Sequence, residues 1–148
     1  MKKILFMLIA VQALSLSLLA QSKLNESSVP EPVKAKFKSL YSGSKVEWWA
    51  KEEGNYVAEF DYQKKEMVVF ITPEGKVIKS EARIQPSEIP GDAQAYIAKH
   101  YPGKKITDAV TTKDHQGNQI YEAEVGDLDL IFDAKGQFIR SVKERPLE

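Results

Sequence analysis

The sequence predicts an α+β fold of two tandem units, each a helix followed by a four-stranded antiparallel meander, with both helices on one face of the sheet. Three observations predict it: blocks of sequence recur, apolar residues first follow helical spacing, and they then alternate as they do in strands. The 148 residues suffice for one domain, or for two very small ones that share a core.

The recurring blocks begin at a constant offset of 60 residues. Val29-Pro30 opens a segment that ends in Tyr-Ser-Gly-Ser-Lys, and Ile89-Pro90 opens one that ends in Tyr-Pro-Gly-Lys-Lys. Two later blocks follow in the same order, because residues 56–60 match 121–125 and residues 70–78 match 131–139. This shared order indicates a duplication, with a first unit at 29–84 and a second at 89–144.

Each unit is expected to open with a helix and to continue with strands. The apolar stripe that predicts the helices consists of Val33, Phe37, Leu40 and Tyr41 in the first unit and Ala93, Ile97 and Tyr101 in the second. Pro30 and Pro90 suit a first helical turn, and Gly43 and Gly103 suit helix ends. Alternation then predicts strands at 45–51, 56–62, 66–71 and 76–82, and again at 105–113, 119–125, 127–132 and 137–143.

Alternation also predicts which side chains meet the helices. In the strand at 56–62 the even-numbered residues are apolar and are expected to face the helix, which leaves Glu59 and Asp61 on the opposite face. The same logic places Trp48 under the helix and Trp49 on the helix-free face. In the second unit the acidic side chains expected on that face are Glu122, Glu124, Asp127 and Asp129. The helix-free face is therefore expected to be acidic and to carry Trp49.

Residues 1–20 have the layout of a secretory signal peptide. A basic start at Lys2 and Lys3 precedes an apolar run that ends at Ala20. An uncleaved membrane anchor is the alternative, but polar residues interrupt the run, and about 20 predominantly apolar residues are needed to cross a bilayer. Residues 21–28 are polar and predict a flexible leader. We expect a periplasmic or secreted protein with no stable membrane insertion after cleavage.

Composition excludes several functional classes. Basic and acidic residues number 21 each, and loss of Lys2 and Lys3 with the signal peptide leaves a net charge of −2, so the basic excess of a nucleic-acid binder is missing. The chain has no cysteine, which excludes disulfides and thiolate metal sites. His100 is expected to be partly buried at a helix end and His115 to lie in a solvated turn, and neither stands in a catalytic motif. The sequence predicts no enzyme, no catalytic residue and no cofactor.

Several motifs together resemble a known family. They are the Val-Pro or Ile-Pro helix start, the helix end Tyr-x-Gly-x-Lys, the strand Tyr-x-x-Glu followed by an apolar residue, and the hairpins at 70–78 and 131–139. This layout resembles the PepSY-like family of secreted bacterial proteins, also described as β-lactamase-inhibitor-like, over residues 29–143. The resemblance implies an exported, non-enzymatic binding or inhibitory module and brings no catalytic residues.

Two hypotheses about function follow. In the first, the helix-free face binds an unidentified protein or peptide, such as a cell-envelope protein or peptidase that it inhibits; the expected contact residues are Trp49, Glu59, Asp61, Glu122, Glu124 and Asp129. In the second, an envelope protein binds a small ligand or a calcium ion through the acidic face, where Asp127, Asp129 and Asp133 offer oxygen ligands. In the alternative interpretation, Trp49 packs against its neighbours on the sheet, and the acidic side chains only keep this face in contact with water. The oligomeric state stays open.

Overall fold

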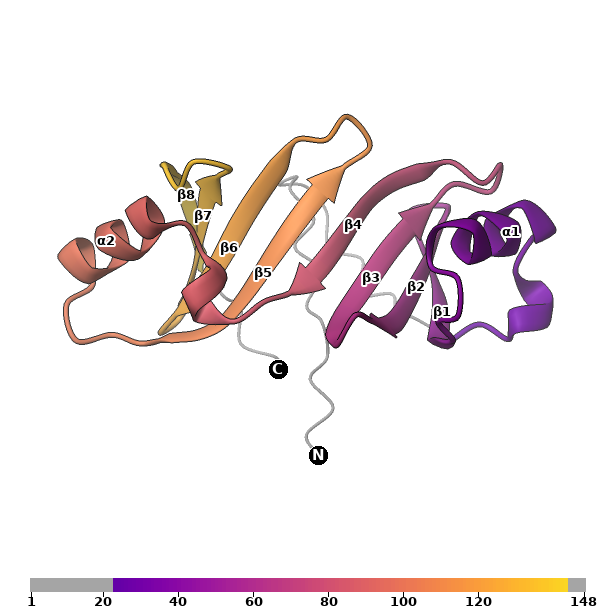
Figure 1. The fold of residues 1–148 in the computed structure, drawn as a ribbon, viewed down its shortest axis with the longest axis horizontal. Coiled ribbons are helices and arrows are strands. Elements are labelled where there is room, and N and C mark those ends of the chain that lie inside the picture. Colours follow the sequence, from indigo (N-terminus) through magenta and orange to yellow (C-terminus); the bar gives the residue numbers. More distant parts are fainter. Residues whose placement is uncertain (1–22, 144–148) are drawn as a thin grey trace.

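The computed structural model describes residues 23–143, which form two helices and one eight-stranded antiparallel sheet. In chain order the elements are η1 (Glu26–Ser28), α1 (Glu31–Leu40), β1 (Val46–Glu52), β2 (Asn55–Tyr62), β3 (Lys65–Ile71), β4 (Val77–Arg83), η2 (Pro86–Glu88), α2 (Gly91–His100), β5 (Ile106–Asp114), β6 (Gln119–Val125), β7 (Leu128–Asp133) and β8 (Phe138–Lys143). The strands follow one another across the sheet in chain order, and α1 and α2 lie near its two ends with β4 and β5 between them (Figure 1). The predicted α+β class and all eight strands are confirmed, with strand ends shifted by at most one residue.

Each helix packs one apolar stripe against its own four strands. The first core contains Val33 and Phe37 of α1 together with Val29, Trp49, Tyr56, Ala58, Phe60, Val69 and Ile71. The second contains Ala93 and Ile97 of α2 together with Ile84, Ile89, Ala109, Ala123, Val125, Leu130 and Phe132. The predicted stripe is wrong at Leu40, which is 45% exposed because it ends α1 on the side away from the sheet.

Two glycines show how closely the hairpins approach the helices. A Cβ on Gly75, in the turn between β3 and β4, would lie 2.7 Å from the carbonyl oxygen of Pro32. A Cβ on Gly136, in the equivalent turn between β7 and β8, would lie 2.8 Å from the amide nitrogen of Ala93. Both glycines also have a positive φ, so a side chain there would add backbone strain to a steric clash. The two turns thus fix the first turn of each helix in the same way.

The structural repeat begins earlier than the sequence indicated. The Leu24 amide donates to the Trp49 carbonyl at 2.7 Å, and the Ile84 amide, 60 residues later, donates to the Ala109 carbonyl at 2.9 Å. The short helices η1 and η2 follow at the same offset. The prediction of a flexible leader at 21–28 is therefore wrong for Leu24, which forms a bridge to β1 and packs on the first core. We call Leu24–Arg83 the first half and Ile84–Lys143 the second half.

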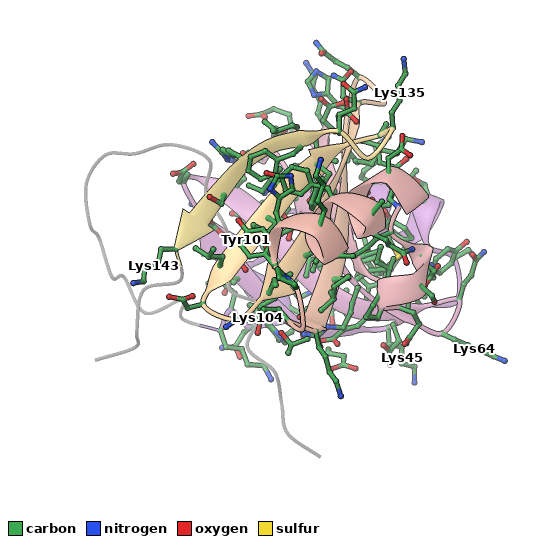
Figure 2. All side chains as sticks on the ribbon, turned by 90° about the vertical axis from the view of Figure 1, so that its left-hand side faces the viewer. Lys45, Lys64, Tyr101, Lys104, Lys135 and Lys143 are labelled. Atoms are coloured by element: carbon green, nitrogen blue, oxygen red, sulfur yellow. The ribbon has the colours of Figure 1, made fainter. Side chains whose placement is uncertain are left out.

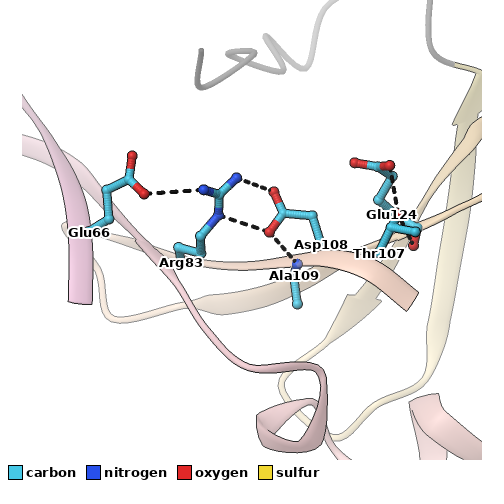
Figure 3. A network of polar contacts seen from close by, with 6 residues as sticks. All are labelled: Glu66, Arg83, Thr107, Asp108, Ala109 and Glu124. Carbon is cyan, nitrogen blue, oxygen red and sulfur yellow. Dashed lines mark hydrogen bonds and ion pairs between the residues drawn. The ribbon is translucent and has the colours of Figure 1, made fainter. Parts of the chain in front are cut away.

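The two halves join by strand pairing between β4 and β5, from Lys79 opposite Asp114 to Arg83 opposite Val110. Arg83 spans this seam (Figure 3). Its guanidinium donates to both oxygens of Asp108 on β5, at 2.9 and 2.5 Å, and to Glu66 on β3 at 3.2 Å. These three side chains are 21–32% exposed, so water screens the ion pairs only in part. The Arg83 side chain therefore couples three adjacent strands across the seam.

Arg83 and Asp108 should show a coupling free energy of about 1–2 kcal/mol, because a bidentate, partly buried ion pair is worth more than a surface pair. A double-mutant cycle of Arg83→Ala and Asp108→Ala, followed by urea unfolding, measures it. The matched control is Lys143 with Asp127, whose side chains are 74% and 69% exposed and 3.5 Å apart. That pair should couple by no more than about 0.5 kcal/mol. Equal couplings for the two pairs would contradict the prediction.

Several lysines lie at turns and strand ends. Lys45, Lys64, Lys104, Lys135 and Lys143 all point outward, as the view from the α2 end shows (Figure 2). Among residues 23–143 no helix is long and apolar enough to cross a membrane. The predicted signal peptide at 1–20 lies outside the described residues.

Candidate functional site

A β-bulge in β1 reverses the predicted orientation of the two tryptophans. Val46 and Trp48 pair with Phe60 and Glu59, which are adjacent on β2, so Glu47 is an extra residue in β1. From Trp48 onward the side chains therefore lie on the faces opposite to those that regular alternation predicts. Trp49 points into the first core and Trp48 lies on the helix-free face, and the prediction of Trp49 as an exposed anchor is wrong.

Trp49 is a packing residue. It is 4% exposed, and its ring meets that of Phe37 on α1 edge-on at 5.9 Å between centroids. Its carbonyl accepts the hydrogen bond from Leu24, whereas its indole nitrogen is buried with no hydrogen-bond partner among the described residues. The indole thus contributes apolar contact and no polar function.

The sequence held a signal for this bulge. The equivalent bulge in β5 lies between Ile106 and Asp108. Strict alternation from Ile106, which packs on the second core, would have placed the Asp108 carboxylate under α2. Because a carboxylate is costly to bury in an apolar core, that conflict indicated an extra residue before Asp108, and by the repeat before Trp48.

The helix-free face of the first half carries an apolar cluster of its own. It consists of Ala50, Val57, Val68 and Phe70, which are 0–5% exposed, with the partly buried Trp48 and Ile78 packed against them. We call this set the apolar cluster. Lys79 lies over the Phe70 ring at 4.2 Å and binds Glu81 at 2.7 Å. This half of the face is thus apolar at its centre, where the sequence predicted an acidic surface.

Glu59 lies beside the apolar cluster. It pairs across β1 and β2 with Trp48 and is 9% exposed. Burial raises the pKa of Glu59, the charge of Glu66 raises it further, and a hydrogen bond from the Trp48 side chain partly offsets the increase. Asp61, two residues along β2, is exposed. Of these two predicted contact residues, only Glu59 adjoins Trp48 on the face.

A carboxylate cluster lies on the helix-free face at the seam between the halves. We define it as Glu81 of β4 together with Asp108, Glu122 and Asp129 of the second half. Glu122 lies at its centre, and burial raises the pKa of this carboxyl to about 8. The charges of Asp129, Glu81 and Asp108 raise it in that order, and Arg140 lowers it. Asp129 is 7% and Glu81 is 8% exposed, so much of this charge is poorly hydrated. At neutral pH Glu122 therefore holds its proton.

Strand pairing shows that the two clusters occupy equivalent positions of the repeat. Trp48 pairs with Glu59 as Asp108 pairs with Glu124, and Ala50 pairs with Val57 as Val110 pairs with Glu122. The next strands, β3 and β7, pair in equivalent register, because Glu59 pairs with Val68 as Glu124 pairs with Asp129. Equivalent positions on this face are therefore Trp48 and Asp108, Val57 and Glu122, and Val68 and Asp129. Three apolar side chains of the first half correspond to three acids in the second.

The structure brings the predicted residues Glu122, Glu124 and Asp129 together on adjacent strands, since Glu124 pairs with Asp129. Thr107 donates a hydrogen bond to Glu124 at 2.6 Å (Figure 3). Residues that the sequence analysis missed on this face are Trp48, Glu66, Glu81, Arg83, Asp108 and Arg140. Arg140 has a buried Nε with no hydrogen-bond partner among the described residues.

The acids considered for calcium do not form a site. Asp127 precedes β7 and pairs with Lys143, whereas Asp133 ends β7 and accepts hydrogen bonds from the amides of its own turn. Residues 23–143 contain no group of three His, Cys, Asp or Glu side chains placed to hold a metal ion.

The histidines lie away from the carboxylate cluster. His100 is exposed and stacks on Tyr96 at 4.2 Å, so its predicted partial burial is wrong. His115 lies in the exposed turn between β5 and β6, as predicted.

These features define a duplicated sheet protein with two helix-covered cores and one helix-free face of mixed apolar and acidic character. The chain belongs to the PepSY-like family, described as "Putative beta-lactamase-inhibitor-like, PepSY-like", whose pattern matches residues 19–79 and again 78–140. The resemblance that the sequence motifs suggested is thus confirmed. Both matched segments begin upstream of the helices, in agreement with the earlier start of the repeat at Leu24.

Solved structures share this fold. A DUF2874 family protein from Bacteroides uniformis is 21% identical over 77% of this chain and 88% of its own, with a TM-score of 0.71. One of the "putative periplasmic proteins" from Bacteroides eggerthii is 18% identical over 78% and 88%, with a TM-score of 0.69. A BLIP-like protein from Bacteroides fragilis is 17% identical over 77% and 86%, with a TM-score of 0.64. No curated protein matches the chain. The name of the Bacteroides eggerthii protein places that relative in the periplasm, the compartment that the sequence analysis expects for this chain.

Proposed function

We propose that this protein is an exported, non-enzymatic binding module that holds a protein or peptide partner on its helix-free face and inhibits a cell-envelope protein or peptidase. The family description, β-lactamase-inhibitor-like, supports a binding role over a catalytic one. Fold-level likeness does not name a partner, so the proposal depends on the face itself.

One observation carries the proposal: the apolar cluster lies outside both helix-covered cores. The first core already stabilises the first half with α1 against four strands. On the opposite face the buried apolar cluster supports Trp48, which is partly exposed and has Glu59 beside it, so this face presents an aromatic side chain next to a polar one. Tryptophan is among the residues most often found as interface anchors.

Trp48→Ala should leave the free energy of unfolding within about 1 kcal/mol of the wild type while weakening partner capture by about 2 kcal/mol, or roughly thirtyfold. The measurement is a pull-down from envelope extract with tagged protein, followed by an affinity titration of the protein that co-purifies. Leu40→Ala is the matched control, because Leu40 is an exposed apolar residue at the end of α1. Capture that is lost in Leu40→Ala, or retained in Trp48→Ala, would contradict the proposal.

The same preparation tests the alternative, in which the acidic face binds calcium or a small ligand. A rise in melting temperature with millimolar calcium relative to chelator would favour the alternative, provided that no protein partner co-purifies.

A further inference from the structure

The outer edge of β8 is a strand edge with which no segment of residues 23–143 pairs. The strands follow the order β1 to β8 across the sheet, so β8 lies at one end of it (Figure 1). At the other end, the edge of β1 is met by Leu24, whose amide donates to the Trp49 carbonyl. A strand edge with unpaired amides and carbonyls can form hydrogen bonds to an added strand.

The repeat shows what an edge of this kind accepts. β8 is the equivalent of β4, because residues 140–143 pair with β7 as residues 79–82 pair with β3. The outer edge of β4 is covered by β5, which pairs with it in the antiparallel direction. The fold therefore already adds an antiparallel strand at such an edge once, at the seam between the halves.

Backbone hydrogen bonds at the seam identify which groups of β8 point outward. The carbonyl of Ile78 accepts a hydrogen bond from the His115 amide at 2.9 Å. The amide of Ile84 donates to the Ala109 carbonyl at 2.9 Å. Because the groups that face one neighbouring strand recur at every second residue, the even-numbered residues of β4 bond to β5. Their equivalents in β8, whose amides and carbonyls face the open edge, are Ile139, Ser141 and Lys143.

The side chains at both ends of β8 are accessible. Phe138 is 36% and Ile139 53% exposed, and they are two of the three exposed large apolar residues in the described part of the chain. The side chain of Lys143 is 74% exposed. Its ammonium nitrogen lies 3.5 Å from a carboxylate oxygen of Asp127, whose side chain is 69% exposed. Water screens this pair, so Lys143 stays accessible to a second carboxylate.

The charges of β8 select an acidic segment. β8 contains two basic residues, Arg140 and Lys143, and no acidic one. At the seam the equivalent strand places Lys79 opposite Asp114 of β5, so an acid there already faces this edge. Arg140 acts on Glu122 of its own sheet, whose pKa it lowers. Lys143 is therefore the basic side chain that an acid on an added strand would neutralise, since opposite charges on paired strands attract.

We propose that the outer edge of β8 binds an extended segment of another protein as an additional antiparallel strand, with an acidic residue of that segment opposite Lys143. The amides and carbonyls of Ile139, Ser141 and Lys143 form the hydrogen bonds, and Lys143 contributes the charge selection. This edge is separate from the helix-free face, so the inference goes beyond the proposed function and adds a second interaction surface.

A synthetic peptide that copies residues 106–115 and carries Thr111→Glu is the probe. In the seam register residue 111 lies opposite Ala82, the equivalent of Lys143, so the new acid should lie opposite Lys143. Titration into isotope-labelled protein, followed by nuclear magnetic resonance, should shift the β8 amides most and saturate by about 1 mM peptide. The same peptide with Thr111→Lys, which places like charges opposite each other, should bind at least about threefold more weakly.

Two methylated copies of the peptide test the main-chain pairing without changing the protein. The amide of residue 113 points toward the partner strand in the seam register, and that of residue 112 points away. N-methylation at residue 113 should therefore weaken binding at least about tenfold, because the methyl group replaces a donor and collides with β8. N-methylation at residue 112 should leave the affinity within about threefold.

A pair of protein variants tests the same edge. Ser141→Pro removes an outward amide, and an edge strand tolerates proline at a position whose amide faces solvent. This variant should bind the peptide at least about tenfold more weakly than the wild type. Ser141→Ala is the matched control, because it loses the hydroxyl and keeps the amide, and its affinity should stay within about twofold. If Ser141→Pro does not fold, the methylated peptides decide the question.

Three results would overturn the inference: equal effects of the two methylations, shifts centred outside β8, or no saturable shift. Shifts of the β8 amides that depend on protein concentration without peptide would overturn it as well, because a second copy would then be the occupant. Trp48→Ala should bind the peptide as the wild type does. The edge and the helix-free face are thus tested separately, and failure of one proposal leaves the result for the other unchanged.

Discussion

Trp49→Ala should lower the free energy of unfolding by about 3–5 kcal/mol. The side chain is 4% exposed, lies edge-on against Phe37, and occupies the space between α1 and β1, so its removal leaves a large cavity in the first core. Urea or thermal unfolding followed by circular dichroism measures the loss. This expectation reverses the one that regular strand alternation gives, under which Trp49→Ala would be nearly neutral.

Two further variants sharpen that test. Trp49→Phe should cost less than half as much, because the indole nitrogen has no hydrogen-bond partner in the described part of the chain and only volume is lost. Trp48→Ala, on the other side of the strand, should change stability by less than about 1 kcal/mol. Similar losses for Trp48→Ala and Trp49→Ala would show that the bulge does not set their orientation.

Stability should fall as the pH rises from about 4.5 to 8, because of Glu122. Its folded pKa is about 8, above the ordinary value of 4.5, so in this window the folded chain holds a proton that the unfolded chain has released. Unfolding then releases a proton, and the free energy of unfolding decreases until the pH passes about 8. One pKa unit corresponds to about 1.4 kcal/mol, so the full loss is on the order of 3–5 kcal/mol.

Glu122→Gln should remove most of this pH dependence, since glutamine keeps the shape of the protonated carboxyl and cannot ionise. Urea unfolding at pH 4.5, 6, 7.5 and 9 should show the variant and the wild type equal at the lowest pH and several kcal/mol apart at the highest. The raised pKa of Glu59 adds a residual slope of the same sign. Lowered pKa values at Glu88 and Asp114 act in the opposite direction and below this window. Glu124→Gln, on the same strand and face, is the control and should retain the wild-type slope.

The fold could be predicted well from the sequence, because the patterns that indicate its elements are local and occur in both repeats. Helical stripes, prolines before each helix and alternating strands located both α-helices and all eight strands, and the hairpin glycines marked the turns. The bulges were missed because an extra residue changes the face of a side chain without changing local composition. That single shift moved Trp49 from the surface into the core. The pairing of Leu24 with β1 was missed for a similar reason. A bridge that involves one residue leaves no pattern in a polar segment by which it could be recognised.

The candidate site was predicted in part. Acids on alternate residues of β6 and β7 indicated an acidic face, and the structure places Glu122 and Asp129 there. The contributions of Glu81 and Asp108 depend on the pairing of β4 with β5 across the seam, which no local pattern reveals. The apolar cluster is not evident in the sequence, because Val57, Val68 and Phe70 alternate with inward-facing residues and look like ordinary strand residues. Burial on a face without a helix is a property of the assembled sheet.

The seam between β4 and β5 also bears on solubility. The outer strands of the sheet are β1 and β8, which are the repeat equivalents of β5 and β4. Since β4 and β5 pair with each other at the seam, β8 of one molecule could pair in the same way with β1 of another. Head-to-tail pairing of separate molecules in that register would place Lys143 opposite Lys51, where the seam has Ala82 opposite Thr111. The incoming strand would also find the Trp49 carbonyl already occupied, because this carbonyl accepts a hydrogen bond from the Leu24 amide. We therefore expect these two like charges and this hydrogen bond to disfavour fibre formation, and we expect the smallest changes that promote polymerisation to lie at the outer edges of the sheet.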